Sequence, residues 1–348
     1  MNLRAALIVY AKRIPPVLFY SMDETFVFFA PMAGSTTLAE EGSKQVFVAA
    51  TEQKKGLTVC LTVKASGHVL PLQLIYEGKT DLSTPGGKPK NARAWQPLPA
   101  RVAADAAGHD VTATPSHWAT EDSHKQHFER VILLDYKRTC TELGHNLDEL
   151  PVAQWPSMIY QLDVYAVHRK RTVLERFKLK YPFVHFLFVP AGTTPVAQVL
   201  DTAINRPFKH HIKQSFIQDS VQQITSQLDA GTAAGDTKLD LSGRYLKPLS
   251  LMWAVGAHQH IHGMSDLVLS GYKNAGTLRA FDDSYQRAAM TEMGRLFEVP
   301  LLDPVLKVPQ LLQVFEDEQN ADAVEDDAAV QASDLEAALL ARPAHNNY

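Results

Sequence analysis

Two short apolar runs on either side of a charged segment constrain the fold of this chain most strongly. The runs are "MIYQLDV" and "VHFLFVP", and "RKRTVLERFKLK" lies between them. This is the spacing of a strand, a crossover helix and a second strand, which places the two strands parallel in one sheet with a right-handed connection. The sequence therefore predicts an α/β protein.

The segments around this unit extend the prediction. Residues 26–76 contain the runs "FVFFA", "QVFVAA", "LTVCLTV" and "VLPLQLIY", separated by polar turns, which predict an antiparallel meander. Residues 79–117 are rich in Pro, Gly and Ala and predict a long irregular excursion. Apolar residues recur at three and four over residues 121–144 and step by four over residues 195–217, so both segments are expected to be helical.

Composition shifts divide the chain into four predicted regions. We expect an α/β domain over residues 1–228, a linker over 229–240 around "DAGTAAGDTK", a C-terminal helical region over 241–315 and a disordered acidic tail over 316–348. No apolar run reaches the roughly 20 residues needed to cross a bilayer, so no membrane partner is expected. Two cysteines form neither a disulfide framework nor a metal-binding pair, which favours an intracellular protein without a signal peptide.

Charge is distributed unevenly along the chain. The net charge is −4, but the tail holds nine acids and one base, which leaves the remainder positively charged. Residues 164–213 carry nine Lys and Arg against two acids. This segment is either a surface for a polyanion or a solvated helix face, and charge alone favours the second interpretation.

Three aspartates are embedded in apolar sequence: Asp23 in "FYSMDETF", Asp163 in "YQLDVYA" and Asp201 in "AQVLDTAINRPFK". A buried carboxylate is costly unless it is paired or bound to a cation. Convergent carboxylates suit Mg²⁺, and two such ions can promote phosphodiester chemistry. For any one aspartate taken singly, a strand end or a helix cap is the favoured interpretation, and only the pattern of all three points to metal binding.

Five stretches in order resemble the pogo/jerky branch of the mariner-like DDE transposases, the DDE superfamily endonuclease domain. They are "VLFYSMDETFVFF", "GSKQVFVAATEQKKGLTVCLTVKASGHVLPLQLIYEGKT", "HWATEDSHKQHFERVIL", "MIYQLDVYAVHRK" and "VHFLFVPAGTTPVAQVLDTAINRPFKHHIK". The resemblance implies a ribonuclease-H-like mixed sheet flanked by helices. It also implies that Asp23, Asp163 and Asp201 are catalytic residues that bind two Mg²⁺ or Mn²⁺ ions.

By the same resemblance, water would cleave DNA at a transposon end and the freed 3′-hydroxyl would attack target DNA. DNA is then the expected partner, the nucleus the expected location and a homodimer an open assembly state, with no small-molecule cofactor. Residues expected to contact DNA are His168, Arg169, Lys170, Arg171, Arg206, Lys209 and Lys213. Arg169, Lys170 and Arg171 lie at the start of a predicted helix, where positive charges are unfavourable with respect to the helix dipole. They are therefore not there to stabilise the helix, which favours a role in binding phosphate.

Other candidates are weaker. Glu24 follows Asp23 on a strand, so the two side chains are expected to point to opposite faces. His258, His260 and His262 alternate within a helical pattern, which spreads them around the helix and argues against a three-histidine metal site.

Members of the resembled family carry helix-turn-helix DNA-binding domains before the catalytic domain, whereas only 22 residues precede Asp23 here. Two hypotheses follow. The chain is a DDE-type nuclease or transposase catalytic domain, or it is a non-catalytic, truncated or domesticated copy that binds DNA or protein partners.

Overall fold

The computed structural model describes residues 1–30, 55–88, 96, 98–163, 171–190 and 192–296. Its centre is one six-stranded sheet in the order β4-β3-β2-β1-β5-β6. The strands are β1 (Phe19–Phe28), β2 (Gly56–Lys64), β3 (Gln73–Glu77), β4 (Asp110–Thr114), β5 (Met158–Asp163) and β6 (Val184–Val189). Strand β2 is antiparallel to both neighbours, whereas β1–β5, β5–β6 and β3–β4 are parallel pairs.

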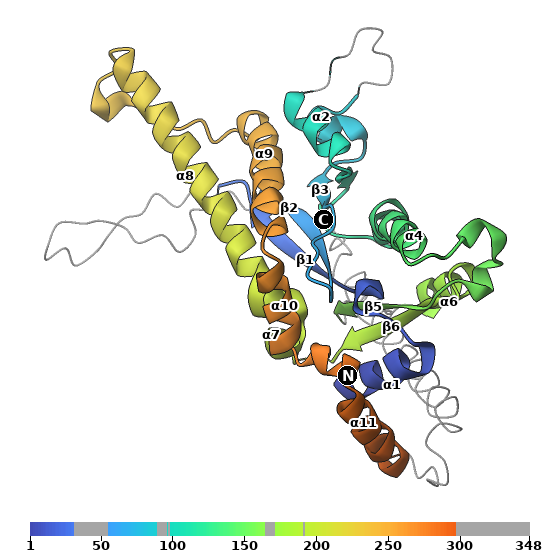
Figure 1. The fold of residues 1–348 in the computed structure, drawn as a ribbon. Helices are drawn as coiled ribbons and strands as arrows, with labels where there is room; N and C mark the ends of the chain where they lie inside the picture. The colour runs from blue at the N-terminus through green and yellow to red at the C-terminus, as the bar shows by residue number, and fades with distance from the viewer. Residues whose placement is uncertain (31–54, 89–95, 97, 164–170, 191, 297–348) are drawn as a thin grey trace, which may run out of the picture.

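Helices cover both faces of this sheet (Figure 1). The α-helices are α1 (Asn2–Lys12), α2 (Pro99–Ala106), α3 (Glu121–His127), α4 (Leu133–Glu142), α6 (Arg171–Lys180), α7 (Thr194–Ala197), α8 (Asn205–Asp229), α9 (Gly243–His262), α10 (Ser265–Asn274) and α11 (Asp283–Leu296). Two π-helical segments join them, η3 (Phe128–Ile132) before α4 and η6 (Leu200–Ile204) before α8. The predicted mixed sheet flanked by helices is confirmed.

Successive side chains along β1 point to opposite faces of the sheet, so Tyr20 marks one face and Ser21 the other. On one face, the hydroxyl of Tyr20 donates to Asp135 of α4 at 3.0 Å, and Tyr160 of β5 stacks on His124 of α3. On the other face, the hydroxyl of Ser21 donates to Gln198 at 3.3 Å. Helices α9 and α10 also lie on this second face, where the Tyr272 hydroxyl donates to the Phe19 carbonyl at 3.2 Å.

The core consists of the apolar residues between these layers. Aromatic side chains fill the α3–α6 side, where Phe128 lies edge-on to Phe177 with ring centroids 5.2 Å apart. One buried ion pair ties helix α4 to the sheet, with Lys64 Nζ 2.9 Å from Asp135 Oδ2. Both side chains are almost fully buried, so the charge of Lys64 depends on Asp135 for compensation, while Asp135 also pairs with the exposed Arg138.

Several sequence predictions can be compared with these elements. The parallel strand–helix–strand unit is present as β5, α6 and β6, and the helix expected over 121–144 is α3 to α4. The expected irregular excursion over 79–117 is partly wrong, because it contains α2 and the edge strand β4. The run "QVFVAA" and the acidic tail lie outside the described residues.

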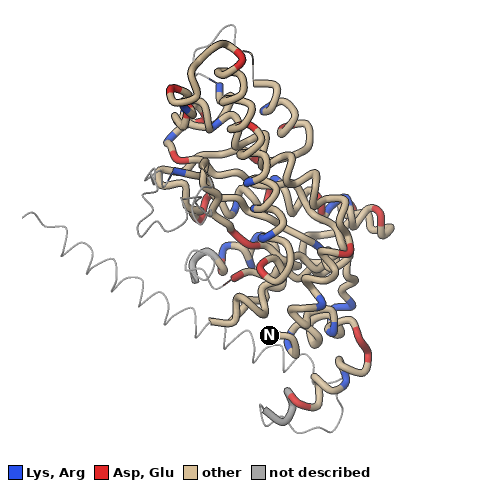
Figure 2. Tube along the Cα trace, turned by 90° about the vertical axis from the view of Figure 1, so that its left-hand side faces the viewer, with Lys and Arg blue, Asp and Glu red and all other residues tan. Residues whose placement is uncertain are grey.

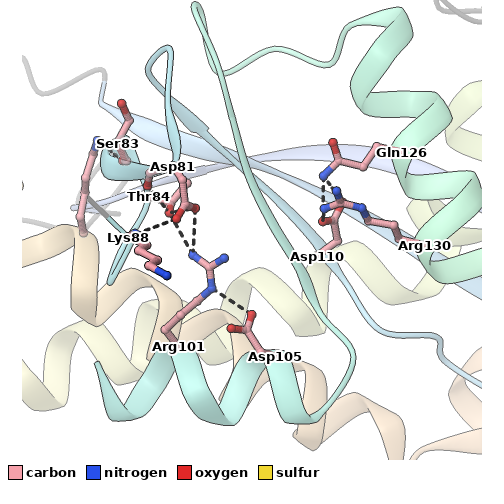
Figure 3. Close-up of polar contacts among 10 residues, drawn as sticks. Asp81, Ser83, Thr84, Lys88, Arg101, Asp105, Asp110, Gln126 and Arg130 are labelled. Carbon is pink, nitrogen blue, oxygen red and sulfur yellow. Dashed lines mark hydrogen bonds and ion pairs between the residues drawn. The ribbon is translucent and has the colours of Figure 1, made fainter. Parts of the chain in front are cut away.

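Polar contacts hold the unpredicted edge segment in place (Figure 3). Asp110 at the start of β4 is buried and accepts a hydrogen bond from Gln73 of β3. It also accepts a hydrogen bond from Gln126 and forms an ion pair with Arg130 at 2.9 Å. Separately, Arg101 of α2 contacts Asp105 of the same helix at 2.9 Å. Strand β4 is therefore stabilised by its pairing with β3 and by these contacts, and a local sequence pattern does not reveal either.

Along the described trace, basic and acidic residues are interspersed in the view of Figure 2. No helix in the described ranges combines the length and apolar character needed to span a membrane. Helices α9 and α10 contact the first part of the chain: His258 of α9 hydrogen-bonds to the Leu70 carbonyl at 2.9 Å, and the Tyr272 hydroxyl of α10 donates to the Val63 carbonyl of β2 at 3.0 Å.

Candidate active site: three aspartates on one face of the sheet

Strand register places Asp23 and Asp163 on the same face of neighbouring strands. Ser21 of β1 is paired with Gln161 of β5 in a parallel ladder. Side chains two residues apart on a strand share a face, so Asp23 and Asp163 project to the same side as Ser21 and Gln161. This is the face covered by the chain segment that contains Asp201.

Asp201 comes from a helix rather than a strand. It lies in the π-helical segment η6, and the first residue of the following helix α8 is Asn205. Single π-helical turns insert an extra residue into a helix and often occur at functional sites. Here the turn directs Asn205 toward β1, and the exposed Asp201 contacts Asn205.

The side chain of Gln198 fixes this turn against β1. Gln198 is fully buried, and its Nε2 donates to the Met22 carbonyl at 2.8 Å while its Oε1 accepts from Ser21 and from the Val199 amide. On its other side the turn contacts α10, where the hydroxyl of Thr202 donates to the Gly271 carbonyl at 3.2 Å. Asp201 is therefore positioned by contacts to both the sheet and a neighbouring helix.

Asn205 connects two of the three aspartates directly. Its Nδ2 donates to Asp23 Oδ2 and to Asp201 Oδ1, each at 2.7 Å. Because one nitrogen contacts both oxygens, these two carboxylate oxygens are separated by no more than twice that distance. Asp163 is contacted by the hydroxyl of Thr194 of α7 at 3.4 Å.

The electrostatics of Asp23 reflect this crowding of like charges. Burial raises the pKa of its carboxyl from the ordinary 3.8 to about 7, with the charge of Asp201 as the next cause and that of Asp163 as a smaller one. The hydrogen bond from Asn205 acts in the opposite direction. Asp23 is only 9% exposed, and burial disfavours its charged form. A cation bound nearby would compensate that negative charge.

The donor chemistry of the cluster suits Mg²⁺ or Mn²⁺, because every candidate ligand atom is an oxygen. Within the described ranges, however, no three His, Cys, Asp or Glu side chains are arranged to hold a metal ion as they stand. The amide nitrogen of Asn205 lies between two of the carboxylates and donates to both.

The other predicted residues fall in different places. Arg206 and Lys209 are exposed and Lys213 half-buried on the first turns of α8, just beyond Asp201. His168, Arg169 and Lys170 lie outside the described residues, as does the side chain of Arg171 at the start of α6. Glu24 is on the opposite face from Asp23, paired with Cys60 across the β1–β2 ladder.

The three histidines of α9 do not converge. His258 is buried with its ring 4.7 Å from that of His109, while His260 stacks on His211. Residues that the sequence did not single out complete the aspartate site, above all Asn205 and Gln198. Their only sequence signal was an amide within the apolar stripe of a predicted helix.

Fold and site together define an α/β protein with a ribonuclease-H-like sheet and a cluster of aspartates beside its central strands. No family model matches the sequence, and no curated protein matches it either.

Among solved structures, the chain is similar to the Mos1 transposase paired-end complex with the left transposon end, at 13% identity and a TM-score of 0.35 over 76% of this chain and 60% of that one. It is similar to the catalytic domain of the Mos1 mariner transposase at 11% identity and a TM-score of 0.32, over 76% of this chain and 91% of that one. The mariner Mos1 paired-end complex with Mg gives 14% identity and a TM-score of 0.34, over 74% and 60%. The chain thus spans about 60% of the transposase chain in the paired-end complexes.

Proposed function

We propose that this chain is a metal-dependent DNA endonuclease and strand transferase of the DDE type, with Asp23, Asp163 and Asp201 as its metal-binding residues. The observation that carries the proposal is spatial. The acids lie 140 and 38 residues apart in the sequence. Even so, Asn205 joins the first to the third, and the charge of the second raises the pKa of the first.

When bound, Mg²⁺ or Mn²⁺ would supply charge neutralisation and activation of the attacking oxygen for phosphodiester chemistry. The protein residues supply position. Gln198 holds the start of the helix against β1. Asn205 holds the carboxylates of Asp23 and Asp201 together, and the hydroxyl of Thr194 contacts and orients Asp163. Phosphoryl transfer depends mainly on such positioning and on electrostatic stabilisation.

The basic residues of α8 support a DNA substrate. Arg206, Lys209 and Lys213 are spaced by three and four, so they lie along one side of the helix that begins at the aspartate site. Lysine and arginine neutralise backbone phosphates without reading sequence. DNA bound along this side of α8 would reach the carboxylates.

The test is cleavage of supercoiled plasmid DNA in Mg²⁺ or Mn²⁺ by the wild type and by Asp163→Asn, which keeps the shape of the side chain but removes its charge. We expect nicked or linear product from the wild type and a loss of at least 100-fold in the variant, as for removal of a group that stabilises charge in the transition state. Equal activity in both proteins would remove the assigned role of Asp163.

A second candidate is a non-catalytic, transposase-derived module that binds DNA or protein. One observation favours it, namely that the described carboxylates do not by themselves form a three-ligand metal site. Titration calorimetry with Mn²⁺ separates the two candidates. Binding that is abolished by Asp23→Asn supports the nuclease, whereas DNA binding without any Mn²⁺ binding supports the module.

A further inference from the structure

Asn205 has a hydrogen-bonding pattern that its position in a helix does not require. The side chain is 7% exposed, and both of its N–H donors are directed at carboxylates, one on β1 and one on η6. Its carbonyl oxygen Oδ1 is buried without any hydrogen-bond partner among the described residues. A buried amide oxygen without a donor is unfavourable, so the pattern calls for a ligand.

The carboxamide of Asn205 can present either of two different groups, its NH₂ or its oxygen, to the carboxylates of Asp23 and Asp201. Its NH₂ end stabilises the carboxylates of Asp23 and Asp201 by donating a hydrogen bond to each. Rotation about the Cβ–Cγ bond exchanges NH₂ for oxygen, and this torsion is broad and roughly two-fold in asparagine. After such a rotation the oxygen faces the carboxylates, an arrangement that is unfavourable without a cation and favourable with one.

We propose that Asn205 is a metal-responsive residue of the site. Without a cation its NH₂ group holds Asp23 and Asp201 together, and when a divalent cation binds, its carboxamide turns so that Oδ1 joins the oxygen donors. This inference rests on the proposed metal dependence and adds a ligand that the three-aspartate pattern does not contain.

An ordinary structural asparagine would give a different arrangement. A residue that only stabilised the start of α8 would bond to backbone groups of that helix, but both Asn205 donors contact side-chain carboxylates. An amide that only bridged two acids would be expected to have its oxygen hydrogen-bonded to another group, whereas Oδ1 has no such partner within the described part of the chain.

The first test measures Mn²⁺ affinity of the full chain by titration calorimetry. Asn205→Leu retains similar size and removes both polar ends, and we expect it to weaken Mn²⁺ binding by 10- to 100-fold, the usual effect of losing a ligand-orienting partner. Gln214→Leu is the matched control, because it removes an exposed amide from the same helix. Wild-type affinity in Asn205→Leu would overturn the proposal.

A second variant covers the case in which Asn205→Leu does not fold. Asn205→Asp keeps the oxygen and replaces the donor by a third negative charge. We expect a lower melting temperature than wild type without divalent cations and a larger increase than wild type when Mn²⁺ is added. An Asn205→Asp protein that Mn²⁺ stabilises less than wild type would contradict a ligand role for this position.

Nuclear magnetic resonance tests the rotation itself. With asparagine labelled by ¹⁵N, the side-chain NH₂ signal of Asn205 is assigned by its loss in Asn205→Asp. Added Mg²⁺ should shift this signal as its protons leave the two carboxylates, while the signal of the exposed Asn146 stays unchanged. Saturating Mg²⁺ binding with no change at Asn205 would overturn the proposal.

Failure of this inference and failure of the proposed function are distinguishable. A wild-type protein that binds Mn²⁺ through Asn205 but cuts no DNA removes the nuclease and leaves the role of Asn205 standing. A protein that cuts DNA, with unchanged Mn²⁺ affinity in Asn205→Leu, removes only the inference. A wild type that binds no Mn²⁺ overturns both.

Discussion

Asp23 is the residue at which the proposed function and the stability of the fold conflict. Its raised pKa means that the folded state holds a proton more tightly than the unfolded state does. The stabilising effect of that proton is complete below pH 3.8 and is lost as pH rises through about 7. The loss corresponds to roughly 4 kcal/mol across this window.

We therefore predict that Asp23→Asn abolishes cleavage and makes the metal-free protein more stable than wild type at pH 8. The difference in free energy of unfolding should grow between pH 4 and pH 7 and then level off. Urea denaturation at several pH values without divalent cations measures it. Asp236→Asn, at an exposed position, is the control and should show no such trend.

A second residue-scale prediction concerns acid stability. Burial lowers the pKa of both His109 and His258 from 6.5 to about 4, so both are neutral in the folded protein at neutral pH. As the pH falls below 6.5, these histidines bind protons in the unfolded state but not yet in the folded state. The free energy of unfolding therefore falls between pH 6.5 and pH 4, by about 3 kcal/mol per histidine.

His258→Gln tests this point, because its amide can still donate to the Leu70 carbonyl but does not titrate. We expect a smaller loss of stability than wild type between pH 6.5 and pH 4, measured by urea denaturation. An identical pH profile in both proteins would show that His258 is not responsible.

At the scale of elements, the buried pair between Lys64 of β2 and Asp135 of α4 holds one helical layer to the sheet. Asp135→Asn leaves the Lys64 charge uncompensated, and we expect the free energy of unfolding to fall by about 3–5 kcal/mol. Glu142→Gln on the same helix removes only one partner of an exposed ion pair with Arg138. That control should cost less than about 1 kcal/mol, as for other surface pairs.

The contact between α10 and the π-helical turn gives a prediction away from the aspartates. A Cβ atom at Gly271 would lie 2.8 Å from the Val199 carbonyl oxygen and 3.4 Å from the Cβ of Ala203. Gly271→Ala should therefore displace the turn that carries Asp201, lower stability by about 1–3 kcal/mol and weaken Mn²⁺ binding. Gly263→Ala is the control, since a Cβ there meets nothing within 4 Å.

Sequence pattern identified the elements whose signal is local. The parallel β5–α6–β6 unit and the helix from Glu121 to Glu142 follow directly from spacing of apolar residues. Helix α2 and strand β4 were missed, because "DVTAT" is short and gains its order from pairing with β3 and from the contacts of Asp110. Tertiary partners, and not propensity, decide such segments.

The candidate site divides in the same way. The three aspartates were recognisable because an acid in an apolar run is unusual, and the family resemblance grouped them. Asn205 was not recognisable, since its meaning depends on a contact with Asp23, a residue 182 positions away. Register and helix packing bring the two together, and neither is encoded in a local motif.

For the molecule as a whole, the proposed DNA binding by the basic side of α8 should depend on salt concentration. The logarithm of affinity changes by about −0.9 per neutralised phosphate for each unit of log salt concentration. Replacing both Arg206 and Lys209 by Ala should therefore weaken duplex DNA binding and reduce the slope by about 2, without altering Mn²⁺ affinity. Lys238→Ala, at an exposed position beyond the end of α8, should leave the slope unchanged.

Helix α8 begins at the aspartate site and continues without interruption for 25 residues, a rise of about 37 Å. Two of the three acids are fixed to strands within a six-stranded sheet, but Asp201 is attached to the near end of this long helix. A helix behaves as a stiff rod over such a length. A molecule bound at its far end would therefore act on one acid and not on the other two, and the contacts of Gln198 and Thr202 at the near end would resist the resulting displacement.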